Sequence, residues 1–497
     1  METAVTRRIA ERFSRLDPAQ RRVVYQGLRE KGLTPGQFPI LARQGGAADG
    51  SAPVSYAQMR QWFLWQLDPQ STAYHISGAL RLSGALAADL VRASLEVIVA
   101  RHAALRTVFR VDAEGGVEQV VRTEACFDFT HIDLAAEPAA QHEALAMQAA
   151  QRIANTPFDL VNGPLLRAGL IRMADDTHVL VLVMHHIVSD GWSLHLMMDE
   201  FAALYRSCGS LTQAGLTRLP VTYADYAVWQ RNWMEAGEQE RQLDHWRAQL
   251  GGRQPVLQLP ADHGRRTDGR YTAATHAFAL PRALKQALQS LAQDRECTLF
   301  MVLLTAFQAL LYRCSGQDDV RVGVPIANRH RVETEGLVGF FVNTQVLRGL
   351  VDPRQSLLQL LAQTREAALG AQANQDLPFE QLVEALQPER IPGIHPLFQV
   401  LFNHQRGGLG ALESIPGLAL APFVIEGQAA QFELMLITEE NPDGRLEARF
   451  SYAAELFDAQ TIERMAGHYL ALLRALAEHP EQAVGDVALM DEAETLQ

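Results

Sequence analysis

The chain has 497 residues, of which 48% are hydrophobic and 20% are charged, and its formal net charge at pH 7 is -13. A chain of this length and apolar content buries more than one core, so we expect two comparable lobes. The negative net charge, with basic residues scattered along the chain, excludes the electrostatic footprint of a protein that follows a nucleic-acid backbone.

The cysteines and the N-terminus indicate a compartment. Four cysteines lie far apart without a CxxC pair, which argues against a disulfide framework or a thiolate zinc site and favours a reducing cytoplasm. The first residues, "METAVTRRIAERF", are too charged for a signal peptide, and no later apolar run is long enough to cross a bilayer. We therefore expect a cytoplasmic protein without a membrane or nucleic-acid partner.

Residues 1–52 are predicted to form an N-terminal helical segment followed by a linker. Two stretches have apolar residues at helical spacing, and Asp17 is placed to cap the second helix, with Pro18 in its first turn. The following stretch is rich in glycine, proline and alanine, which is typical of a connector. The main body of the protein is expected to begin near Pro53.

Residues 53–230 are predicted to form an N-terminal lobe of class α/β. "YHISGALRLSG" alternates like a strand, and "DLVRASLEVIVARHAAL" has its apolar residues at helical spacing. Further strand-like runs follow this helix. Helices and strands therefore alternate along this part of the chain.

Residues 231–497 are predicted to form a C-terminal lobe that repeats this order. A strand over 272–280, helices over 282–297 and 298–316, and a strand over 319–328 follow one another. The sequence identity between the two halves is thin, but the order of elements predicts two similar lobes. The chain ends without an obvious cap or tail, so we expect it to be cut from a longer protein.

The stretch "VLVLVMHHIVSDGWS" places two histidines at the end of an apolar run. Successive side chains of a strand point to opposite faces, so His185 and His186 have different environments if the strand over 178–186 keeps its pleat. One histidine then faces a reaction space and the other faces a core. A neutral imidazole can accept a proton from a nucleophile if another group fixes its tautomer.

The residues after the histidines fit two kinds of role. Asp190 either orients an imidazole or pairs with an arginine, and Gly191 allows a backbone N–H group to approach an oxyanion. A histidine at the end of a strand is also often structural. A zinc site on both histidines is disfavoured because their side chains diverge, and the GxSxG turn of serine hydrolases is absent. These residues alone predict an acid–base site of unknown substrate.

"MHHIVSDGWS" resembles the HHxxxDG motif of condensation domains of nonribosomal peptide synthetases. Six further segments resemble that family in the same order: "SYAQMRQWFL", "RHAALRTVF", "YADYAVWQ", "GFFVNTQVLR", "QDLPFEQLVEAL" and "HPLFQVLFNHQ". The resemblance implies two lobes, each like chloramphenicol acetyltransferase, that form a V-shaped pseudo-dimer with a central tunnel. The HHxxxDG loop would lie at the active site.

The resemblance also implies the reaction and its partners. An upstream peptidyl carrier protein would deliver a donor acyl or peptidyl thioester, and a downstream carrier would deliver an aminoacyl thioester whose α-amine attacks it. Both substrates would arrive on 4'-phosphopantetheine arms, with no cofactor bound covalently to this chain. We expect an adenylation domain downstream in the same synthetase, and a role in bacterial secondary metabolite biosynthesis.

The resemblance implies roles for individual residues. His186 would be the general base or the group that positions the amine, and Gly191 would meet the developing oxyanion. Asp190 would form a structural salt bridge with Arg106, the last arginine of the RHxxLRT pattern. Asn343 is a candidate for the substrate cleft. The other residues expected to support the active-site loop are His185, Trp192 and Ser193.

Other matched residues have simpler interpretations. We expect the aromatic side chains of Trp62, Trp229, Phe340 and Phe341 to pack in cores rather than to contact substrate. The family's usual glutamate in RHExLRT is Ala103 here, and a histidine often found before "QDLPFE" is Asn374. Neither position carries catalysis in this interpretation.

Three alternatives stay open at this point. The histidine pair disfavours a heterocyclisation domain, whereas an epimerisation-type relative also carries HHxxxDG, although the companion segments are more similar to condensation domains that join an L-donor to an L-acceptor. A stand-alone acyltransferase of the same superfamily would use a soluble acceptor or a coenzyme A thioester. A carrier-protein recruitment platform would keep the fold without the chemistry.

Overall fold

The computed structural model describes residues 3–43, 50–266, 268–389, 391, 393–407 and 415–490. The chain divides into two compact units. The first unit runs to Arg241 and includes two later segments of the chain. These units are Met1–Arg241 with Ala327–Val342 and Leu409–Gln428, and Gln242–Ile326 with Asn343–Gly408 and Ala429–Gln497.

The first unit is built around a five-stranded sheet with the order β12-β2-β7-β6-β5 and a three-stranded sheet with the order β1-β4-β3. Its strands are β1 (Ser51–Pro53), β2 (His75–Gly84), β3 (Thr107–Val111), β4 (Val117–Val121), β5 (Asp128–Asp133), β6 (Leu166–Ala174), β7 (Thr177–His185) and β12 (Leu418–Pro422). Its helices are α1 (Thr3–Ser14), α2 (Pro18–Glu30), α3 (Tyr56–Leu67), α4 (Ala88–Arg101), α5 (His142–Ala154), α6 (Gly191–Arg206), α7 (Tyr223–Trp233) and α11 (Val332–Glu335).

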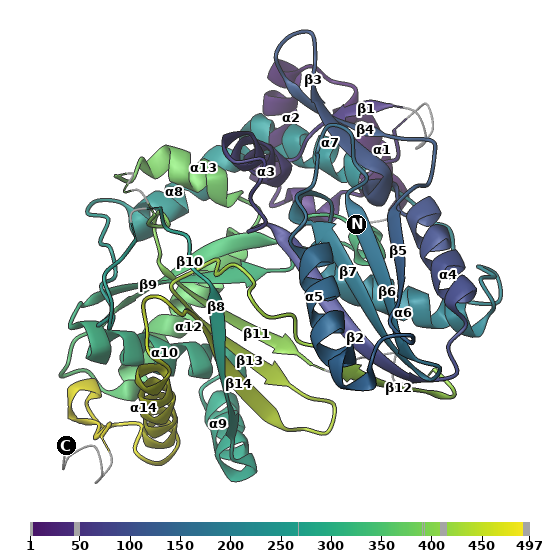
Figure 1. Ribbon diagram of the computed structural model, residues 1–497. Coiled ribbons are helices and arrows are strands. Elements are labelled where there is room, and N and C mark those ends of the chain that lie inside the picture. Colours follow the sequence, from purple (N-terminus) through teal and green to yellow (C-terminus); the bar gives the residue numbers. More distant parts are fainter. Residues whose placement is uncertain are drawn as a thin grey trace. The chain divides into compact units, whose positions relative to one another are not determined.

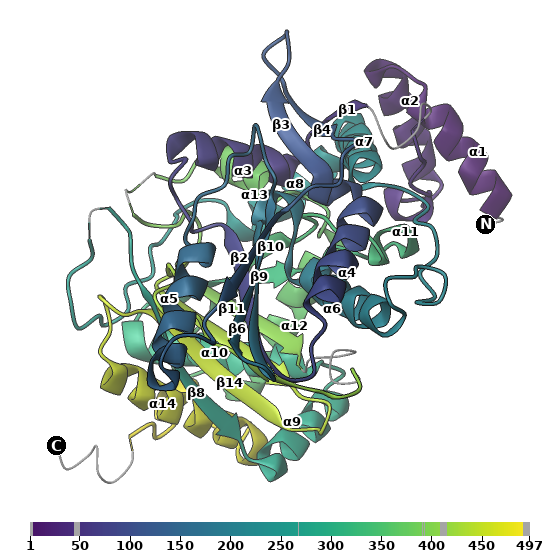
Figure 2. The same ribbon diagram turned by 45° about the vertical axis from the view of Figure 1, so that its right-hand side comes forward.

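The central strand β7 is covered by helices on both of its faces. Its run "VLVLVM" is apolar on both faces, which is typical of a strand covered on both sides. Leu180 and Leu182 pack in one cluster with residues of α4 and α6, while Val181 and Val183 pack in another cluster with residues of α5. Helices α4 and α6 therefore cover one face and α5 covers the other (Figures 1 and 2).

Helix α5 lies close to the sheet because β6 has a glycine beneath it. A Cβ atom placed on Gly169 would lie 2.3 Å from Cδ1 of Ile153 in α5, which is too close for two carbon atoms. A larger residue at this position would require the Ile153 side chain to move.

Helices α3 and α7 of this unit each begin with a capping box. Ser55 caps α3, and its partner in the capping box is Gln58, whose side chain reaches back to the Ser55 backbone. Thr222 caps α7 with Asp225 in the same arrangement. Each cap satisfies N–H groups that have no partner within the helix.

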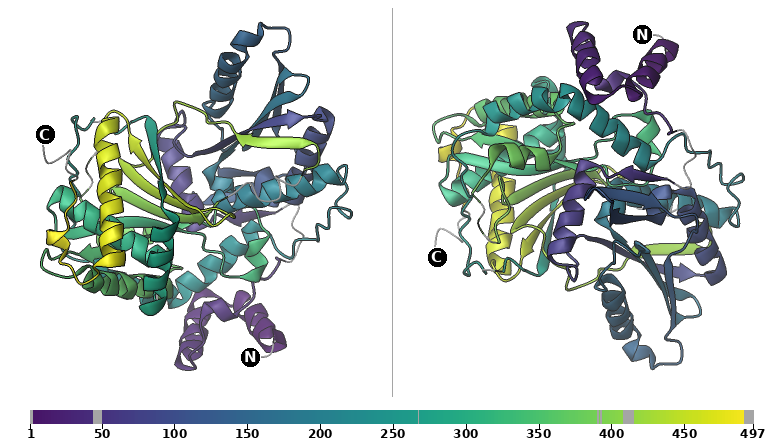
Figure 3. Two further views of the ribbon diagram at one scale, coloured as in Figure 1. Left: turned by 90° about the horizontal axis from the view of Figure 1, so that it is seen from below. Right: turned by 90° about the horizontal axis from the view of Figure 1, so that it is seen from above.

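The N-terminal helical segment is present as expected, and Asp17 caps α2 by accepting a hydrogen bond of 2.9 Å from the Gln20 N–H. The pair packs on Trp233 of α7, whose ring stacks on Phe13 at 3.9 Å between centroids. The hydroxyl of Tyr25 donates to the buried carboxylate of Glu238. Figure 3 shows the two helices as a hairpin on the first unit.

The second unit is built around a six-stranded sheet with the order β10-β9-β11-β13-β14-β8. Strand β11 runs parallel to both of its neighbours, and the other pairs are antiparallel. The strands are β8 (Ala273–Leu280), β9 (Asp319–Ile326), β10 (Asn343–Leu350), β11 (Val400–Arg406), β13 (Leu434–Glu440) and β14 (Leu446–Ala453). The helices are α8 (Gln239–Leu250), α9 (Arg282–Asp294), α10 (Leu299–Ser315), α12 (Leu357–Ala373), α13 (Phe379–Leu386) and α14 (Ala459–Glu478).

The predicted elements of this unit are found where the sequence places them, from strand β8 through helices α9 and α10 to strand β9. Helix α10 is apolar on all sides and is buried from Met301 to Leu311. It packs against α12 and α14 in a single large core with the apolar face of the sheet. Figure 3 shows α14 along the sheet of this unit.

Strand β12 was not predicted from the sequence. It pairs antiparallel with β2, with Leu418 opposite Gly84 and Pro422 opposite Leu80, and it forms the edge of the first unit's sheet. Its sequence "LALAP" is short and ends in proline, which fits an edge strand but gives little signal of its own.

Among the residues that the structure describes, no single helix is both long and apolar enough to span a membrane. Helices α9 and α10 pass this test by length and composition only when taken together, as a pair bent by 106°.

Candidate active site

The loop over residues 185–193, here called the histidine loop, joins strand β7 to helix α6. Strand β7 ends at His185, and His186 begins a single 3-10 turn that extends to Val188. The prediction that both histidines lie on the strand was therefore wrong for His186. The two side chains do have different environments, but the turn separates them and not the pleat.

His185 is buried and supports the loop. Its Nδ1 atom accepts a hydrogen bond of 3.1 Å from the Ile187 N–H, which caps the 3-10 turn. Its ring lies against the ring of His75, at 6.1 Å between centroids, and against that of Phe158, at 6.3 Å. Burial lowers the pKa of His185 well below its ordinary value, with smaller contributions from His75 and His186.

His186 is half-buried, and its tautomer is fixed by the backbone. Its Nδ1 atom lies 3.0 Å from the carbonyl oxygen of Ser189. Because a carbonyl oxygen only accepts, Nδ1 must carry the proton of the neutral ring. The lone pair is then on Nε2, which is the form needed to accept a proton from a substrate.

The electrostatic surroundings of His186 keep the ring neutral. Burial lowers its pKa, Asp190 and the Ser189 carbonyl partly oppose this effect, and Arg60 of α3 adds to it. The ring of Phe340 lies 4.9 Å from the imidazole between centroids. A neutral imidazole at neutral pH has a base-competent nitrogen.

Asp190 is buried and holds the end of the histidine loop. It caps α6 by accepting hydrogen bonds from the Ser193 N–H at 2.8 Å and the Ser193 hydroxyl at 2.7 Å. It also accepts from the Phe341 N–H at 3.0 Å. These contacts agree with a scaffold role for Asp190.

The ionic partner of Asp190 is Arg329. The Arg329 guanidinium lies 3.1 Å from the carboxylate, and the two side chains are 1% and 3% exposed. The same guanidinium donates to the carbonyl oxygens of Thr334 and Leu337, both at 2.6 Å, and stacks on the ring of Phe341 at 4.1 Å. Arg329 therefore joins the histidine loop to the segment Ala327–Val342.

The predicted salt bridge between Asp190 and Arg106 was wrong. Arg106 donates instead to the carbonyl oxygens of Val99, at 3.2 Å, and Arg122, so its guanidinium fastens backbone segments around β3 and β4. The physical reason is that these carbonyls already occupy its donors, while Asp190 is enclosed by groups from another segment of the chain.

The RHAALRT segment contributes to the site through other residues. Arg101 and His102 both bind the carboxylate of Glu200 in α6, at 2.9 and 2.8 Å. Burial raises the pKa of Glu200, but the hydrogen bonds from His102 and Arg101 and the charge of Arg101 outweigh it, so the pKa lies below its ordinary value. Glu200 was missed in the sequence because nothing marks it within the repeating pattern of an amphipathic helix.

Gly191 and Trp192 begin α6 and are both exposed. The first N–H groups of a helix have no partner within the helix, so this end suits a developing negative charge. A Cβ atom placed on Gly191 would meet no atom within 4 Å, so packing inside the chain does not require glycine here. Trp192 donates from its indole N–H to the Glu335 carbonyl at 3.0 Å.

Ser193 connects the histidine loop to the segment that carries Phe340. Its buried hydroxyl accepts from the Arg329 guanidinium at 2.8 Å and from the Gly339 N–H at 3.1 Å. Phe340 was expected only to pack in a core, and it does so, but its ring also covers His186. Sequence reasoning missed this second contact because it joins positions far apart in the chain.

Asn343 begins β10 in the second unit, and its amide is used by the backbone of that unit. Its Nδ2 atom donates to the carbonyl oxygens of Gln375 and Leu377, and its Oδ1 atom accepts from the Thr344 and Phe379 N–H groups. The expected place in a substrate cleft stays a prediction. The contacts give this side chain the task of fixing the turn before α13.

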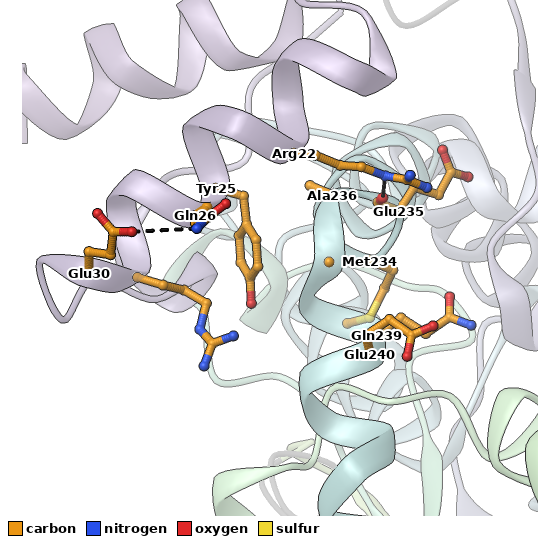
Figure 4. A pocket seen from close by; sticks show the side chains of 11 residues that line it. Arg22, Tyr25, Gln26, Glu30, Met234, Glu235, Ala236, Gln239 and Glu240 are labelled. Carbon is orange, nitrogen blue, oxygen red and sulfur yellow. Dashed lines mark hydrogen bonds between the residues drawn. The ribbon is translucent and has the colours of Figure 1, made fainter.

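A separate hollow of about 880 Å³ lies between α2 and the helical stretch around residues 234–240 (Figure 4). It is lined by Tyr25 and by charged side chains such as Arg22, Arg29 and Glu240, and by none of the predicted site residues. Across the described part of the chain, no group of three or more His, Cys, Asp or Glu side chains could hold a metal ion.

Two α/β units with open sheets define the class expected from the sequence, a protein built of lobes like chloramphenicol acetyltransferase. The family model described as "Condensation domain" matches residues 48–497. The chain belongs to this family, which confirms the family resemblance seen in the histidine loop and its companion segments.

The curated relatives are much longer than this chain. It is 43% identical over 451 residues to one of the linear gramicidin synthase proteins of Brevibacillus parabrevis, a match that covers 90% of this chain and 6% of that protein. It is 38% identical over 471 residues to the phosphinothricin tripeptide synthetase PhsC of Streptomyces viridochromogenes, which covers 94% of this chain and 43% of that protein. A fungal relative is malpinin synthetase of Mortierella alpina, at 38% identity over 462 residues, or 93% of this chain and 6% of that protein.

Solved structures share the fold. The X-domain from teicoplanin biosynthesis has a TM-score of 0.77 at 25% identity, covering 90% of this chain and 99% of that one. The first condensation domain of the calcium-dependent antibiotic synthetase, in complex with a substrate analogue, has a TM-score of 0.68 at 21% identity, covering 88% of this chain and 100% of that one.

The pairing of Asp190 with Arg329 can be tested by two double-mutant cycles. We expect Arg329→Ala to lower the free energy of unfolding by about 3–5 kcal/mol, because it leaves a buried carboxylate without its counter-charge. Arg106→Ala removes hydrogen bonds to carbonyls and should cost about 1 kcal/mol. Urea unfolding of each single variant, and of each combined with Asp190→Asn, gives the coupling energies. A larger coupling of Asp190 to Arg106 than to Arg329 would contradict this assignment.

Buried neutral histidines predict that stability falls in acid. Burial lowers the pKa values of His75 and His185, so the folded state keeps both neutral while the unfolded chain takes up protons below about pH 6.5. The contribution of these two histidines to the free energy of unfolding is therefore fully present above this pH, and it is lost as the pH falls below it. Urea midpoints from about pH 7.5 to 5.5 measure this slope. His75→Phe should make the slope shallower than in the wild-type protein; equal slopes for the two proteins would refute the interpretation.

Proposed function

We propose that this chain forms an amide bond between two substrates held on carrier proteins. The donor is an acyl or peptidyl thioester on an upstream carrier, and the acceptor is the α-amine of an aminoacyl thioester on a downstream carrier. The observation that carries the proposal is His186, a neutral histidine with its lone pair on Nε2, in the HHxxxDG loop of a condensation-domain chain.

The reaction requires little beyond alignment and proton transfer. The amine nitrogen attacks the thioester carbonyl, the C–N bond forms, and the C–S bond breaks with release of the phosphopantetheine thiol. The amine loses a proton in this step, and His186 Nε2 accepts it or holds the N–H group in line with the carbonyl. The Gly191 N–H, at the start of α6, stabilises the negative charge on the carbonyl oxygen.

Several finer expectations belong to this proposal. The chain spans 6% of the linear gramicidin synthase protein that it matches, so the carriers and a downstream adenylation domain are proposed as neighbours in a longer synthetase. One solved structure, at 24% identity to this chain, is that of a four-domain nonribosomal peptide synthetase bound to AMP and glycine. The phosphopantetheine arms belong to the substrates. The central tunnel, the cytoplasmic location, the bacterial origin and the preference for an L-donor and an L-acceptor stay predictions.

The test is peptide transfer between a donor-loaded and an acceptor-loaded carrier, followed by mass spectrometry of the acceptor arm. We expect His186→Ala to slow transfer by about 10²- to 10⁴-fold, the usual contribution of a positioned acid–base group. His131→Ala is the matched control, because His131 is an exposed histidine on the edge strand β5 of the same unit. Undiminished transfer by a folded His186→Ala protein would contradict the proposed role.

The same assay separates the remaining alternatives. A stand-alone acyltransferase would acylate a free amine or accept a coenzyme A thioester faster than the carrier-bound substrates. An epimerisation-type relative would invert the configuration of a single carrier-bound residue without forming an amide. A recruitment platform would bind carriers and form no product. Each of these results would contradict amide formation between carriers.

A further inference from the structure

A continuous chain of hydrogen bonds lies behind His186, inside the first unit. The hydroxyl of Tyr223 donates to the carbonyl oxygen of Phe340 at 2.6 Å. The Ser55 hydroxyl lies 2.8 Å from the same tyrosine oxygen, and the Gln58 N–H donates to Ser55 Oγ at 3.1 Å. Ser55, Gln58 and Tyr223 are all at most 2% exposed.

The direction of each bond in this chain follows from chemistry. The Phe340 carbonyl can only accept, so the Tyr223 proton points to it, and the tyrosine oxygen must accept from Ser55. The Ser55 oxygen in turn accepts from the Gln58 N–H. Each hydroxyl therefore has a single arrangement, and removing one donor leaves a buried acceptor without a partner.

The ring of Tyr223 also packs against the stretch 339–341. A Cβ atom placed on Gly339 would lie 2.1 Å from Cδ2 of Tyr223, so the backbone before Phe340 lies directly on this ring. The ring of Phe341 lies 4.9 Å from Tyr223 between centroids, edge to face. The stretch 339–341 therefore has a rigid support on one side.

The same hydrogen-bonded network also reaches the backbone of the residue after His186. The side chain of Gln58 donates from Nε2 to the carbonyl oxygen of Ile187, at 3.2 Å. Ile187 directly follows His186 in the sequence, and the ring of Phe340 lies on the His186 imidazole. One hydrogen-bonded network thus holds both the backbone of the histidine loop and the aromatic ring that lies on the imidazole.

We propose that Tyr223 is a positioning residue for His186, which holds the Phe340 ring against the imidazole through the Phe340 carbonyl. Tyr223 has no contact with the imidazole and acts through Phe340. The effect on the reaction rate rests on the proposed function, whereas the effect on the imidazole itself does not.

The groups that set the charge of His186 are distinct from this network. Asp190, from the loop itself, and Arg60, from α3, act on its pKa, and His185 is the neighbouring titratable ring. Tyr223→Phe removes none of these groups. A change in the titration of His186 in this variant therefore reports a change in the support of the stretch 339–341, whose Phe340 ring covers the imidazole and whose Phe341 N–H binds Asp190.

The experiment is titration of His186 in the full chain by nuclear magnetic resonance with ¹⁵N-labelled histidine, assigned by loss of its signals in His186→Gln. We expect Tyr223→Phe to raise the pKa of His186 toward its ordinary value, because the looser Phe340 ring lets water reach the imidazole. In the transfer assay we expect kcat to fall roughly 10- to 100-fold with KM unchanged, and the acid limb of the pH profile to shift upward.

Tyr469→Phe is the matched control. Tyr469 is also fully buried and donates its hydroxyl to a backbone carbonyl, that of Leu303 at 3.1 Å, but it lies in the second unit. We expect it to lose stability as Tyr223→Phe does, with the titration of His186 and the pH profile unchanged. Equal titration of His186 in the wild-type, Tyr223→Phe and Tyr469→Phe proteins would overturn the proposal.

A second variant tests the proposed link if Tyr223→Phe folds poorly. Phe340→Leu keeps the backbone carbonyl and its bond to Tyr223 but removes the ring. We expect Phe340→Leu to raise the pKa of His186, as Tyr223→Phe does. We expect the double variant to have the same pKa of His186 as Phe340→Leu alone. An unchanged pKa in Phe340→Leu, or additive shifts in the double variant, would overturn the proposal. These titrations need no substrate, so a failure of the proposed reaction would leave their outcome intact.

Discussion

The ion pair between Asp190 and Arg329 is the interaction on which the site depends. Both side chains are buried, and each would be a costly uncompensated charge without the other. The two residues belong to distant segments of the chain that meet in the first unit, the histidine loop and Ala327–Val342. Because the carboxylate also caps α6 and accepts from the Phe341 N–H, this one pair fixes the loop, the helix start and the aromatic stretch together.

The chemistry of the site follows from where strand β7 stops. Two residues of the same type become different because His185 is the last residue of the sheet and His186 the first residue of a turn. The first ring caps that turn from inside the core. The second ring donates a hydrogen bond from its Nδ1–H group to a backbone carbonyl, which leaves the lone pair on Nε2. The hydrogen bond to the Ser189 carbonyl is thus what fixes the tautomer of His186.

The sequence was sufficient for features that depend on neighbouring residues. The cap at Asp17, the strand ending in the histidine pair and the helices α9 and α10 follow from local patterns, and the family follows from motifs read in order. Contacts between distant segments were not predictable in this way. Arg329 lies outside the matched segments, Phe340 has the appearance of a core residue, and β12 is too short to signal a strand. Each is defined by its partner, and a single sequence does not show that partner.

The central claim is that the backbone fixes His186 with its proton on Nδ1. The ¹⁵N chemical shifts of the two His186 ring nitrogens in the neutral form measure this directly. The structure predicts a protonated Nδ1 and an unprotonated Nε2, because the Ser189 carbonyl accepts from Nδ1. A neutral ring with its proton on Nε2 would contradict the account, since the nitrogen proposed to face the substrate would then have no lone pair to accept a proton.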